Sequence, residues 1–489
     1  MPPPAIKPAR RASTLAARVG AHVALEAQAD GKILARFHDF ALDLGSYGPA
    51  AAKRARDLRS GLRLAAFASG RSVDREIERL VRRLALHGLL EYRQGRRDGA
   101  DQVVIEPQMR DYWPRTPPLD DADILVLSRF AYMRRRGNDL VLESPRAGAL
   151  FRICDAKVAA ALAGLCAPQA IRRLRRREGF PGLELLALLL DCRILFKVEA
   201  GDDGLRPAEG DGNLVLWDFH DLLFHARSTE GRHANPLGGV YSYSDATPPL
   251  PAVRPAWPDD KIDLQALAAA PPEQPSPGAR LMRERHSVRS FDDARPITLG
   301  ELARFLDATA RVLSRWDSRG EFGEDGPAID HTMRPYPSAG ASYELELYLA
   351  VDKCEGLARG FYHYDAGAHA LAPIGARSQD VDALLSGAAF AMAAPATPQI
   401  LIVIAARFGR VSWKYSALAY ALILKDVGVL TQSLYLMATD MGLGGCAVGS
   451  VNIDLFARMT GIEFHVEGPV GLFALGRALE VGERATEEG

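Results

Sequence analysis

The sequence lacks the features that mark several common classes of protein. Its five cysteines stand far apart, with neither a C-x-x-C pair nor another metal-ligand spacing. We therefore expect reduced thiols in a cytoplasmic protein and no disulfide framework. The net charge is −1 and the pI is about 6.8, so no overall field would draw the chain to nucleic acid or to an anionic membrane.

Long apolar segments are also missing. The opening sequence, MPPPAIKPARRASTLAARVG, has no continuous apolar run and so does not form a secretory signal. We expect a flexible tail over residues 1–18. The most apolar window, Ala388–Ala406, has Pro395 and Pro398 in its middle, and these prolines would break a membrane-spanning helix. The window predicts a loop that runs into a buried strand over Gln399–Ile404.

The chain has 489 residues, of which 48% are hydrophobic, enough for two or three domains with real cores. An arrangement of hairpin, helix and strand occurs first within residues 19–115. Alternating strands, His22–Leu25 and Ile33–Phe37, flank an Asp-Gly hairpin signal. Ser72 is the expected N-cap of a helix that ends at Gly88 and leads into a strand. The apolar face of this helix is predicted to comprise Ile77, Leu80, Val81 and Leu84.

The same order of hairpin, helix and strand recurs about 105 residues later in the sequence. Ile124–Leu127 and Leu140–Glu143 flank Gly137-Asn138, and a helix with Leu185, Leu186 and Leu189 leads into a strand over Ile194–Val198. Hairpin, helix and following strand are typical of a winged helix, so we predict two winged-helix-like modules, at residues 19–115 and 116–205.

Residues 206–275 read as a connector, because the segment begins polar and Gly-rich and ends rich in Pro and Ala. Residues 276–489 show a compact α+β pattern. In it a helix is expected to begin near Thr298, and the long apolar segment Ser416–Met441 predicts a helix that is buried on most faces.

Four short segments of this last region suggest a site for an anionic, planar ligand. Arg285-x-Ser287-x-Arg289 could hold a phosphate, and Leu475-Gly-Arg477 offers another arginine. Two runs of small residues, within Arg334–Ser342 and Gly442–Ser450, would let backbone N–H groups approach a flat ring closely. Taken singly, the arginines fit a solvated charged face and the small residues fit ordinary turns.

The order and spacing of the four segments resemble the FMN-dependent nitroreductase superfamily over roughly 200 residues, a length in the normal range for a domain. The resemblance implies a nitroreductase-like fold, bound FMN and a homodimer with FMN at the subunit boundary. The cofactor-binding residues that it implies are Arg285, His286, Ser287, Arg289, Pro337, Ser338, Ala339, Gly340, Gly444, Gly445, Gly476 and Arg477.

A narrower resemblance is to the SagB-type peptide dehydrogenases, or azoline oxidases. It depends on Trp413-Lys414-Tyr415 before the long helix and on the connector phrases Phe219–Ser228 and Gly238–Tyr241. It implies oxidation of thiazoline or oxazoline rings in a ribosomally made peptide, with the N-terminal modules binding that peptide. A YcaO-type cyclodehydratase is an implied partner, since such an enzyme forms the rings.

Lys414 and Tyr415 are the catalytic candidates. Aromatising an azoline removes a proton from the ring carbon that was the amino acid's Cα, while a hydride leaves the adjacent carbon for the flavin. Lys414 would serve as the base if burial disfavoured its charged form. The alternative is that Lys414 makes a surface contact and Tyr415 packs in the core.

The sequence gives less support to three other possibilities: a metal site, an NAD(P)H-dependent reductase and a DNA-binding regulator. His220, His225 and His233 are spaced unsuitably for a metal, and no metal is predicted. A nitro- or quinone reductase using NAD(P)H is the main rival, but such an enzyme has no evident use for peptide-binding modules. A DNA-binding regulator would use the eight arginines between Arg71 and Arg97, yet acidic residues alternate with them as on a solvated helix.

Overall fold

The computed structural model describes residues 15–37, 40–69, 71–95, 100–109, 112–198, 209, 211–232, 244, 246–254, 262–264, 276–318 and 328–479. Its contacts divide the chain into two compact units. Unit 1 comprises Met1–Val215, Leu222–Arg227 and Gly231–Asn235, and unit 2 comprises Leu216–Asp221, Ser228–Glu230 and Pro236–Gly489. The mixture of helices and strands confirms the predicted α+β class.

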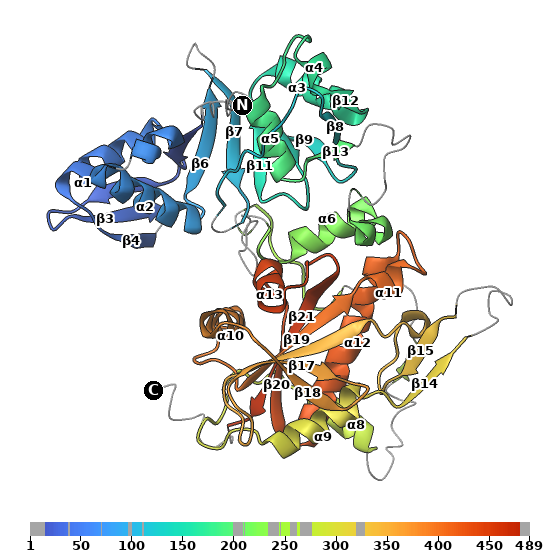
Figure 1. The fold of residues 1–489 in the computed structure, drawn as a ribbon. Helices are drawn as coiled ribbons and strands as arrows, with labels where there is room; N and C mark the ends of the chain where they lie inside the picture. The colour runs from blue at the N-terminus through green and yellow to red at the C-terminus, as the bar shows by residue number, and fades with distance from the viewer. Residues whose placement is uncertain are drawn as a thin grey trace, which may run out of the picture. The chain divides into compact units, whose positions relative to one another are not determined.

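Unit 1 is mainly antiparallel sheet with short helices (Figure 1). Its strands are β1 Ala16–Val19, β2 Ala24–Ala27, β3 Lys32–Phe37, β4 Phe40–Ser46, β5 Leu62–Arg63, β6 Leu90–Gly95, β7 Asp101–Pro107, β8 Ile124–Leu127, β9 Tyr132–Arg136, β10 Asp139–Glu143, β11 Ala149–Ile153, β12 Gln169–Ala170 and β13 Leu195–Val198. Its helices are α1 Pro49–Ala55, α2 Ser72–Leu86, α3 Ala156–Ala163, α4 Ile171–Leu174 and α5 Leu183–Asp191.

One sheet runs through both predicted modules of unit 1. Its order is β5-β1-β6-β7-β11-β10-β9. The step from one module to the other is the antiparallel pair β7–β11, in which Ile105 lies opposite Phe151. Both residues are fully buried in one hydrophobic cluster that spans the two modules. The structure therefore joins residues 19–115 and 116–205 into one unit, where the sequence had suggested two separate modules.

In the first module most predicted elements are confirmed. β2 and β3 form the expected hairpin, and Ile77, Leu80, Val81 and Leu84 form the buried face of α2. The predicted N-cap was wrong, because Arg71 occupies that position and Ser72 already belongs to the helix. The predicted tail over residues 1–18 is too long, since β1 begins at Ala16 and pairs with β6.

In the second module the sequence predicted the wrong strand pair for the hairpin, namely Ile124–Leu127 with Leu140–Glu143. Gly137, at φ 60°, joins β9 to β10, and these two strands pair. β8 instead pairs with β12 and β13, because the strand that follows α5 returns beside it. The helix and strand expected near Leu185 and Ile194 are confirmed as α5 and β13. The winged-helix classification of both modules stays a prediction.

Unit 2 is built on a six-stranded sheet of order β18-β17-β16-β19-β21-β20. The strands of this unit are β14 Ser314–Asp317, β15 Asp330–Met333, β16 Leu345–Val351, β17 Gly360–Asp365, β18 Ala370–Ile374, β19 Ile400–Arg407, β20 Leu443–Val448 and β21 Glu467–Arg477. Its helices are α8 Pro277–Glu284, α9 Leu299–Ala310, α10 Ser378–Met392, α11 Gly409–Ser412, α12 Ala419–Asp440 and α13 Ile453–Thr460.

Helices cover both faces of this sheet (Figure 1). Apolar residues of α10 and α13 form one hydrophobic cluster with the sheet, which includes Phe456 and Leu401. α12 packs against β20, β21 and α9. α9 begins where the sequence predicted, since Thr298 is its N-cap and forms a capping box with Glu301. The strand predicted at Gln399–Ile404 is confirmed as β19.

The long apolar helix is present as α12, but its predicted burial was wrong. Its buried residues form one stripe, namely Ala419, Tyr420, Ile423, Asp426, Leu430, Leu434 and Ala438. Only 28% of its most apolar window is buried in this chain. By length and composition alone α12 is also the one described helix that could span a membrane, a property that core helices of water-soluble domains share.

Part of the predicted connector belongs to the folded units. The helix α6, Phe219–Ser228, lies in it, and Leu216–Asp221 are grouped with unit 2. The indole Nε1 of Trp217 donates to the carbonyl oxygen of His465 at 2.8 Å, and its ring lies 4.6 Å from that of Phe408. A linker prediction from composition misses such anchors. Gly238–Tyr241 lie outside the described residues.

Candidate functional site

The arginine segment lies along the edge strand β20 and the end of its neighbour β21 in unit 2. The backbone N–H of Val288 donates to the carbonyl oxygen of Gly445 on β20 at 2.9 Å. Four residues later Asp292 makes the same kind of bond, also 2.9 Å, to Arg477 at the end of β21. Three of the four predicted segments, far apart in sequence, are thereby brought together.

The glycines of these segments are needed for contacts within the protein. A Cβ on Gly444 would lie 2.6 Å from Cγ1 of Val288. A Cβ on Gly476 would lie 2.7 Å from Cδ1 of Phe291, and one on Gly445 would collide with the ring of Phe473. Their small size lets the arginine segment and the core pack closely. Contact of Gly444, Gly445 and Gly476 with a flavin stays a prediction.

The arginine segment itself presents cationic groups that form no ion pair with a carboxylate of the described residues. Arg289 is exposed and forms no ion pair with another described residue, and Arg285 lies with its guanidinium 5.0 Å from the ring centre of Tyr435. Ser287 Oγ is 2.9 Å from the hydroxyl of Tyr435, which also accepts the backbone N–H of Ala447 at 2.8 Å. Arginines in this state suit an anion such as a phosphate. Sequence reasoning missed Tyr435.

His286 is exposed, and its Nδ1 lies 3.0 Å from the carbonyl oxygen of Glu284. This contact is local to the turn after α8. This contact neither supports nor contradicts cofactor binding by His286, which stays a prediction.

Arg477, the other arginine predicted to bind the phosphate, pairs with a carboxylate of its own chain. Its Nη2 lies 2.9 and 2.6 Å from the two carboxylate oxygens of Glu301, and its Nε donates to the carbonyl oxygen of Arg295 at 2.9 Å. The Arg477 guanidinium holds the pKa of Glu301 at about 2, well below its ordinary value. In this structure Arg477 thus ties the end of β21 to the start of α9.

The fourth segment forms a strained turn before β16. Gly340, Ala341 and Tyr343 all have positive φ, at 57°, 54° and 44°, which costs free energy at a non-glycine residue. Ser338 Oγ accepts the backbone N–H of Tyr343 at 2.9 Å, and Asp426 of α12 accepts the N–H of Ala339 at 2.9 Å. The predicted residues Pro337, Ser338, Ala339 and Gly340 therefore lie on one anchored turn.

The predicted catalytic pair lies against this turn. Lys414 Nζ is 3.5 Å from the carbonyl oxygen of Gly340 and 5.6 Å from the ring centre of Tyr415. A Cβ on Gly340 would lie 2.5 Å from the Tyr415 hydroxyl and 2.9 Å from Lys414 Nζ. α11 ends at Ser412, and its C-cap Trp413 directly precedes the pair. The fold thus places Lys414 and Tyr415 beside a turn that the sequence had selected independently.

The burial expected for Lys414 is not observed. Its side chain is exposed, and so is that of Trp413, at 52%. Within the described residues of this chain nothing covers the ammonium group, so the desolvation on which a lysine base depends would have to come from substrate, cofactor or another subunit. The catalytic role of Lys414 and Tyr415 stays a prediction.

The two described histidines of the predicted set differ in their surroundings. His220 is exposed, with Nδ1 3.1 Å from Asp218, whereas His225 is buried, and His233 lies outside the described residues. Among the described residues no group of three or more His, Cys, Asp or Glu is arranged to hold a metal.

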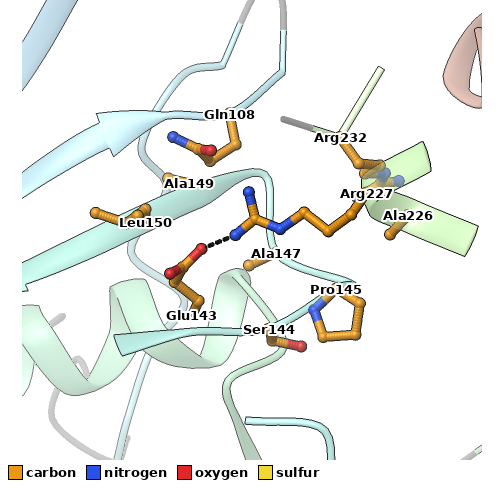
Figure 2. A pocket seen from close by; sticks show the side chains of 10 residues that line it. All are labelled: Gln108, Glu143, Ser144, Pro145, Ala147, Ala149, Leu150, Ala226, Arg227 and Arg232. Atoms are coloured by element: carbon orange, nitrogen blue, oxygen red, sulfur yellow. Dashed lines mark hydrogen bonds and ion pairs between the residues drawn. The ribbon is translucent and has the colours of Figure 1, made fainter. Parts of the chain in front are cut away.

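Unit 1 contains a small cavity, whose lining is drawn in Figure 2. In it Glu143 forms an ion pair with Arg227 of α6 and a second one, at 2.7 Å, with Arg134. The free volume is about 10 Å³, enough for roughly one water molecule. A cofactor or a peptide does not fit, so we regard this cavity as part of the structural core.

Two family models match the chain in different places. Residues 282–477 match the nitroreductase family, and residues 125–234 match the cyanobactin oxidase ThcOx. A protein of Methanocaldococcus jannaschii, provisionally named a nitroreductase, is 32% identical over 197 residues, which are 40% of this chain and 89% of that protein. The chain belongs to the nitroreductase family. As a member of this family it is an oxidoreductase.

Two solved structures are similar in part. A Ralstonia eutropha protein described as a nitroreductase shares 21% identity at a TM-score of 0.31, over 43% of this chain and 86% of that one. A chain of the Escherichia coli microcin synthetase McbBCD complex, solved with truncated pro-MccB17, shares 18% identity at a TM-score of 0.39, over 57% of this chain and 100% of that one. The family assignment depends on the sequence matches alone.

Proposed function

We propose that the protein is an FMN-dependent dehydrogenase that oxidises thiazoline and oxazoline rings to thiazoles and oxazoles in a ribosomally synthesised peptide. One observation carries the proposal. A cyanobactin oxidase region and a nitroreductase domain occur in the same chain. The position of Lys414 and Tyr415 against the Gly340 turn supports the same chemistry.

Members of the nitroreductase family typically bind a flavin, and FMN is the flavin that we propose. Arg285 and Arg289 lie in one segment without carboxylate partners among the described residues, and Ser287 stands between them. A guanidinium pair with a hydroxyl suits the terminal phosphate of FMN. Arg477 is a further candidate for the phosphate: its Nη2 and Nε bond to Glu301 and Arg295, and its Nη1 would be the group that reaches the ligand. When bound, FMN supplies the acceptor for the hydride.

The chain's own residues would manage the proton. The ring carbon derived from Cα loses H⁺ while its neighbour loses H⁻, so that one ring loses two hydrogens in all. We assign Lys414 Nζ as the proton acceptor. The Gly340 carbonyl oxygen, 3.5 Å from Nζ, would accept one N–H of the neutral Lys414 amine. The lone pair of that amine would then point away from Gly340. The Tyr415 hydroxyl would hold the substrate beside it.

The remaining partners are also proposals. The apolar surface of α12 that this chain leaves incompletely buried is the natural interface of a homodimer. The precursor peptide, with its leader and its azoline-bearing core, would be the substrate, and a YcaO-type cyclodehydratase would supply it. We expect the enzyme to work in the cytoplasm, where such peptides are made.

The decisive experiment is mass spectrometry of azoline peptides incubated with purified, FMN-loaded enzyme. We expect a loss of about two hydrogen masses per ring. The Lys414→Ala variant should keep its flavin and lose at least about 100-fold in kcat, because a general base contributes on this scale. Lys353→Ala, an exposed lysine of the same unit, is the control and should behave as wild type. A yellow Lys414→Ala variant with full activity would remove the catalytic assignment.

A second candidate is a nitro- or quinone reductase that uses NAD(P)H, which the relationship to the Methanocaldococcus jannaschii protein favours. Stopped-flow absorbance distinguishes the two. Rapid reduction of the bound flavin by NADPH, together with no conversion of azoline peptides, would support the reductase.

A further inference from the structure

Two buried carboxyl groups meet at the hydroxyl of Ser338. Ser338 Oγ lies 3.2 Å from Oε2 of Glu344 and 3.0 Å from Oδ2 of Asp426. Glu344 precedes β16 and is fully buried, and Asp426, on α12, is 6% exposed. The two residues come from distant parts of the chain, and no sequence motif pointed to either of them.

The hydroxyl of Ser338 cannot hydrogen-bond both carboxyl groups favourably unless one of them carries an additional proton. A serine hydroxyl has one hydrogen and two lone pairs. One lone pair of Ser338 accepts the N–H of Tyr343, so its hydrogen can satisfy only one of the two carboxyl groups. If both were ionised, the other oxygen–oxygen contact would be repulsive. A proton on Glu344, donated to Ser338 while Ser338 donates to Asp426, satisfies every contact in one chain.

The surroundings favour that proton. Oε1 of Glu344 accepts no hydrogen bond from a described residue. Burial, and next to it the negative charge of Asp426, raise the pKa of Glu344 to about 7. The other groups that face Glu344 are Arg410 of α11 and the hydroxyl of Tyr336. Arg410 is directed at the neighbouring backbone, since its Nε donates to the carbonyl oxygen of Ser342 at 2.7 Å.

The cluster holds the turn that meets the catalytic pair. Asp426 binds Ala339 and Ser338, Ser338 binds Tyr343, and Arg410 binds Ser342. These bonds fix the residues on both sides of Gly340, whose carbonyl oxygen faces Lys414. The strained φ angles of this turn persist only if such bonds over-determine it.

We propose that Glu344 and Asp426 share one proton through Ser338 and act as positioning residues that hold the Gly340 turn against Lys414 and Tyr415. The consequence for catalysis rests on the proposed function. Loss of the shared proton places two negative charges at one hydroxyl, so the turn loosens and Gly340 moves away from Lys414. Neither carboxyl group is expected to touch the substrate.

The test compares wild type with Glu344→Gln and Asp426→Asn. The amide of glutamine donates to Ser338 as the protonated acid does, but it does not titrate. Asp426→Asn leaves one carboxyl group and removes the repulsion, so it serves if the first variant does not fold. Glu346→Gln is the matched control, because Glu346 is the next carboxylate along the chain, on β16, and pairs with His363 and Arg334.

Two quantities are measured between pH 6 and pH 9. The first is hydrogen exchange of the amides of residues 338–345 in flavin-free protein, corrected for the intrinsic pH dependence. In wild type and Glu346→Gln this exchange should rise at least about tenfold above the pKa of the pair, and in Glu344→Gln and Asp426→Asn it should stay flat. The second is kcat for azoline oxidation, whose alkaline decline should move to higher pH in the two pair variants.

The outcomes separate the two proposals. Exchange that rises equally in wild type and Glu344→Gln overturns the shared proton. A turn that loosens in wild type while kcat keeps the same pH profile in all variants overturns the positioning role. If wild type oxidises no azoline at any pH but its exchange still responds as expected, the proposed function is wrong and the proton-sharing pair remains.

Discussion

At the scale of single residues, Gly340 shows how little space separates the predicted site residues. Its φ of 57° favours glycine, and a Cβ would enter the space of both Lys414 and Tyr415. Two separate requirements, backbone conformation and close approach, therefore fall on one residue.

A Gly340→Ala substitution tests this arrangement. The left-handed conformation should cost about 1–2 kcal/mol of stability, and the added methyl group should displace the Lys414–Tyr415 pair and lower kcat at least about tenfold, since about 1.4 kcal/mol in the barrier is a factor of ten. Gly387→Ala is the control, because Gly387 lies within α10 with nothing near its Cβ position. Chemical denaturation and the azoline assay measure the two effects. Unchanged kcat in Gly340→Ala would mean that the close approach has no role in catalysis.

Sequence reasoning pointed to segments that the fold brings together, but it gave only part of the reason for their residues. Gly444 and Gly476 were visible as small residues in a family pattern, whereas their contacts with Val288 and Phe291 depend on a strand order that no local pattern contains. Glu344 and Asp426 belong to no sequence motif, because a pair formed by distant segments becomes apparent only when β16 and α12 are placed side by side. An aspartate on the buried stripe of an apolar helix was the one available hint.

At the scale of elements, the end of β21 and the start of α9 are joined by one ion pair. Glu301 closes the capping box of α9 with Thr298 and also receives both contacts from Arg477. One carboxylate therefore stabilises the helix terminus and attaches it to the sheet.

This joint gives a prediction for stability against pH. Because the pKa of Glu301 is lowered to about 2 in the folded state from 4.5, its contribution is fully present above pH 4.5 and is lost as pH falls towards 2. We expect Glu301→Gln to lose about 1–2 kcal/mol at pH 7, a value reduced by solvent screening of a partly exposed pair. The deficit should shrink markedly at pH 3. Urea denaturation at both pH values measures it, with the exposed Glu463→Gln as control, and an equal deficit at both would contradict the assignment.

Prediction of helices succeeded where an apolar repeat extends over many residues. Prediction of strand partners failed, because the partners depend on how strands from distant parts of the chain pair. α2, α5 and α12 were recognised from their apolar spacing. The partners of β8 were not, because Ile124–Leu127 is equally suited to any neighbouring strand. Burial of α12 was overestimated for a related reason, since its apolar residues surround the helix while only one stripe meets the sheet.

At the scale of the whole molecule, the exposed surface of α12 predicts self-association. Val429 is 37% exposed on this helix, and a charge placed there would be buried without a partner at a dimer interface. We expect wild type to sediment as a dimer. The Val429→Asp substitution should raise the dimer dissociation constant at least about tenfold and so favour the monomer. Leu313→Asp, an exposed position outside α12, should remain dimeric. A monomeric wild type, or a dimeric Val429→Asp, would exclude α12 as the interface.

The strand order of unit 2 also constrains how the protein is made. β21 follows every other strand of its sheet in sequence, yet it lies between β19 and β20. β20 has no other strand neighbour in that sheet, so it must wait for β21 before it can pair. During synthesis, β16 and β19 can form their ladder early while an unpaired edge of β19 stays open. Nascent chains stalled before residue 467 should therefore need a chaperone to shield that edge, because only β21 can close the sheet between β19 and β20.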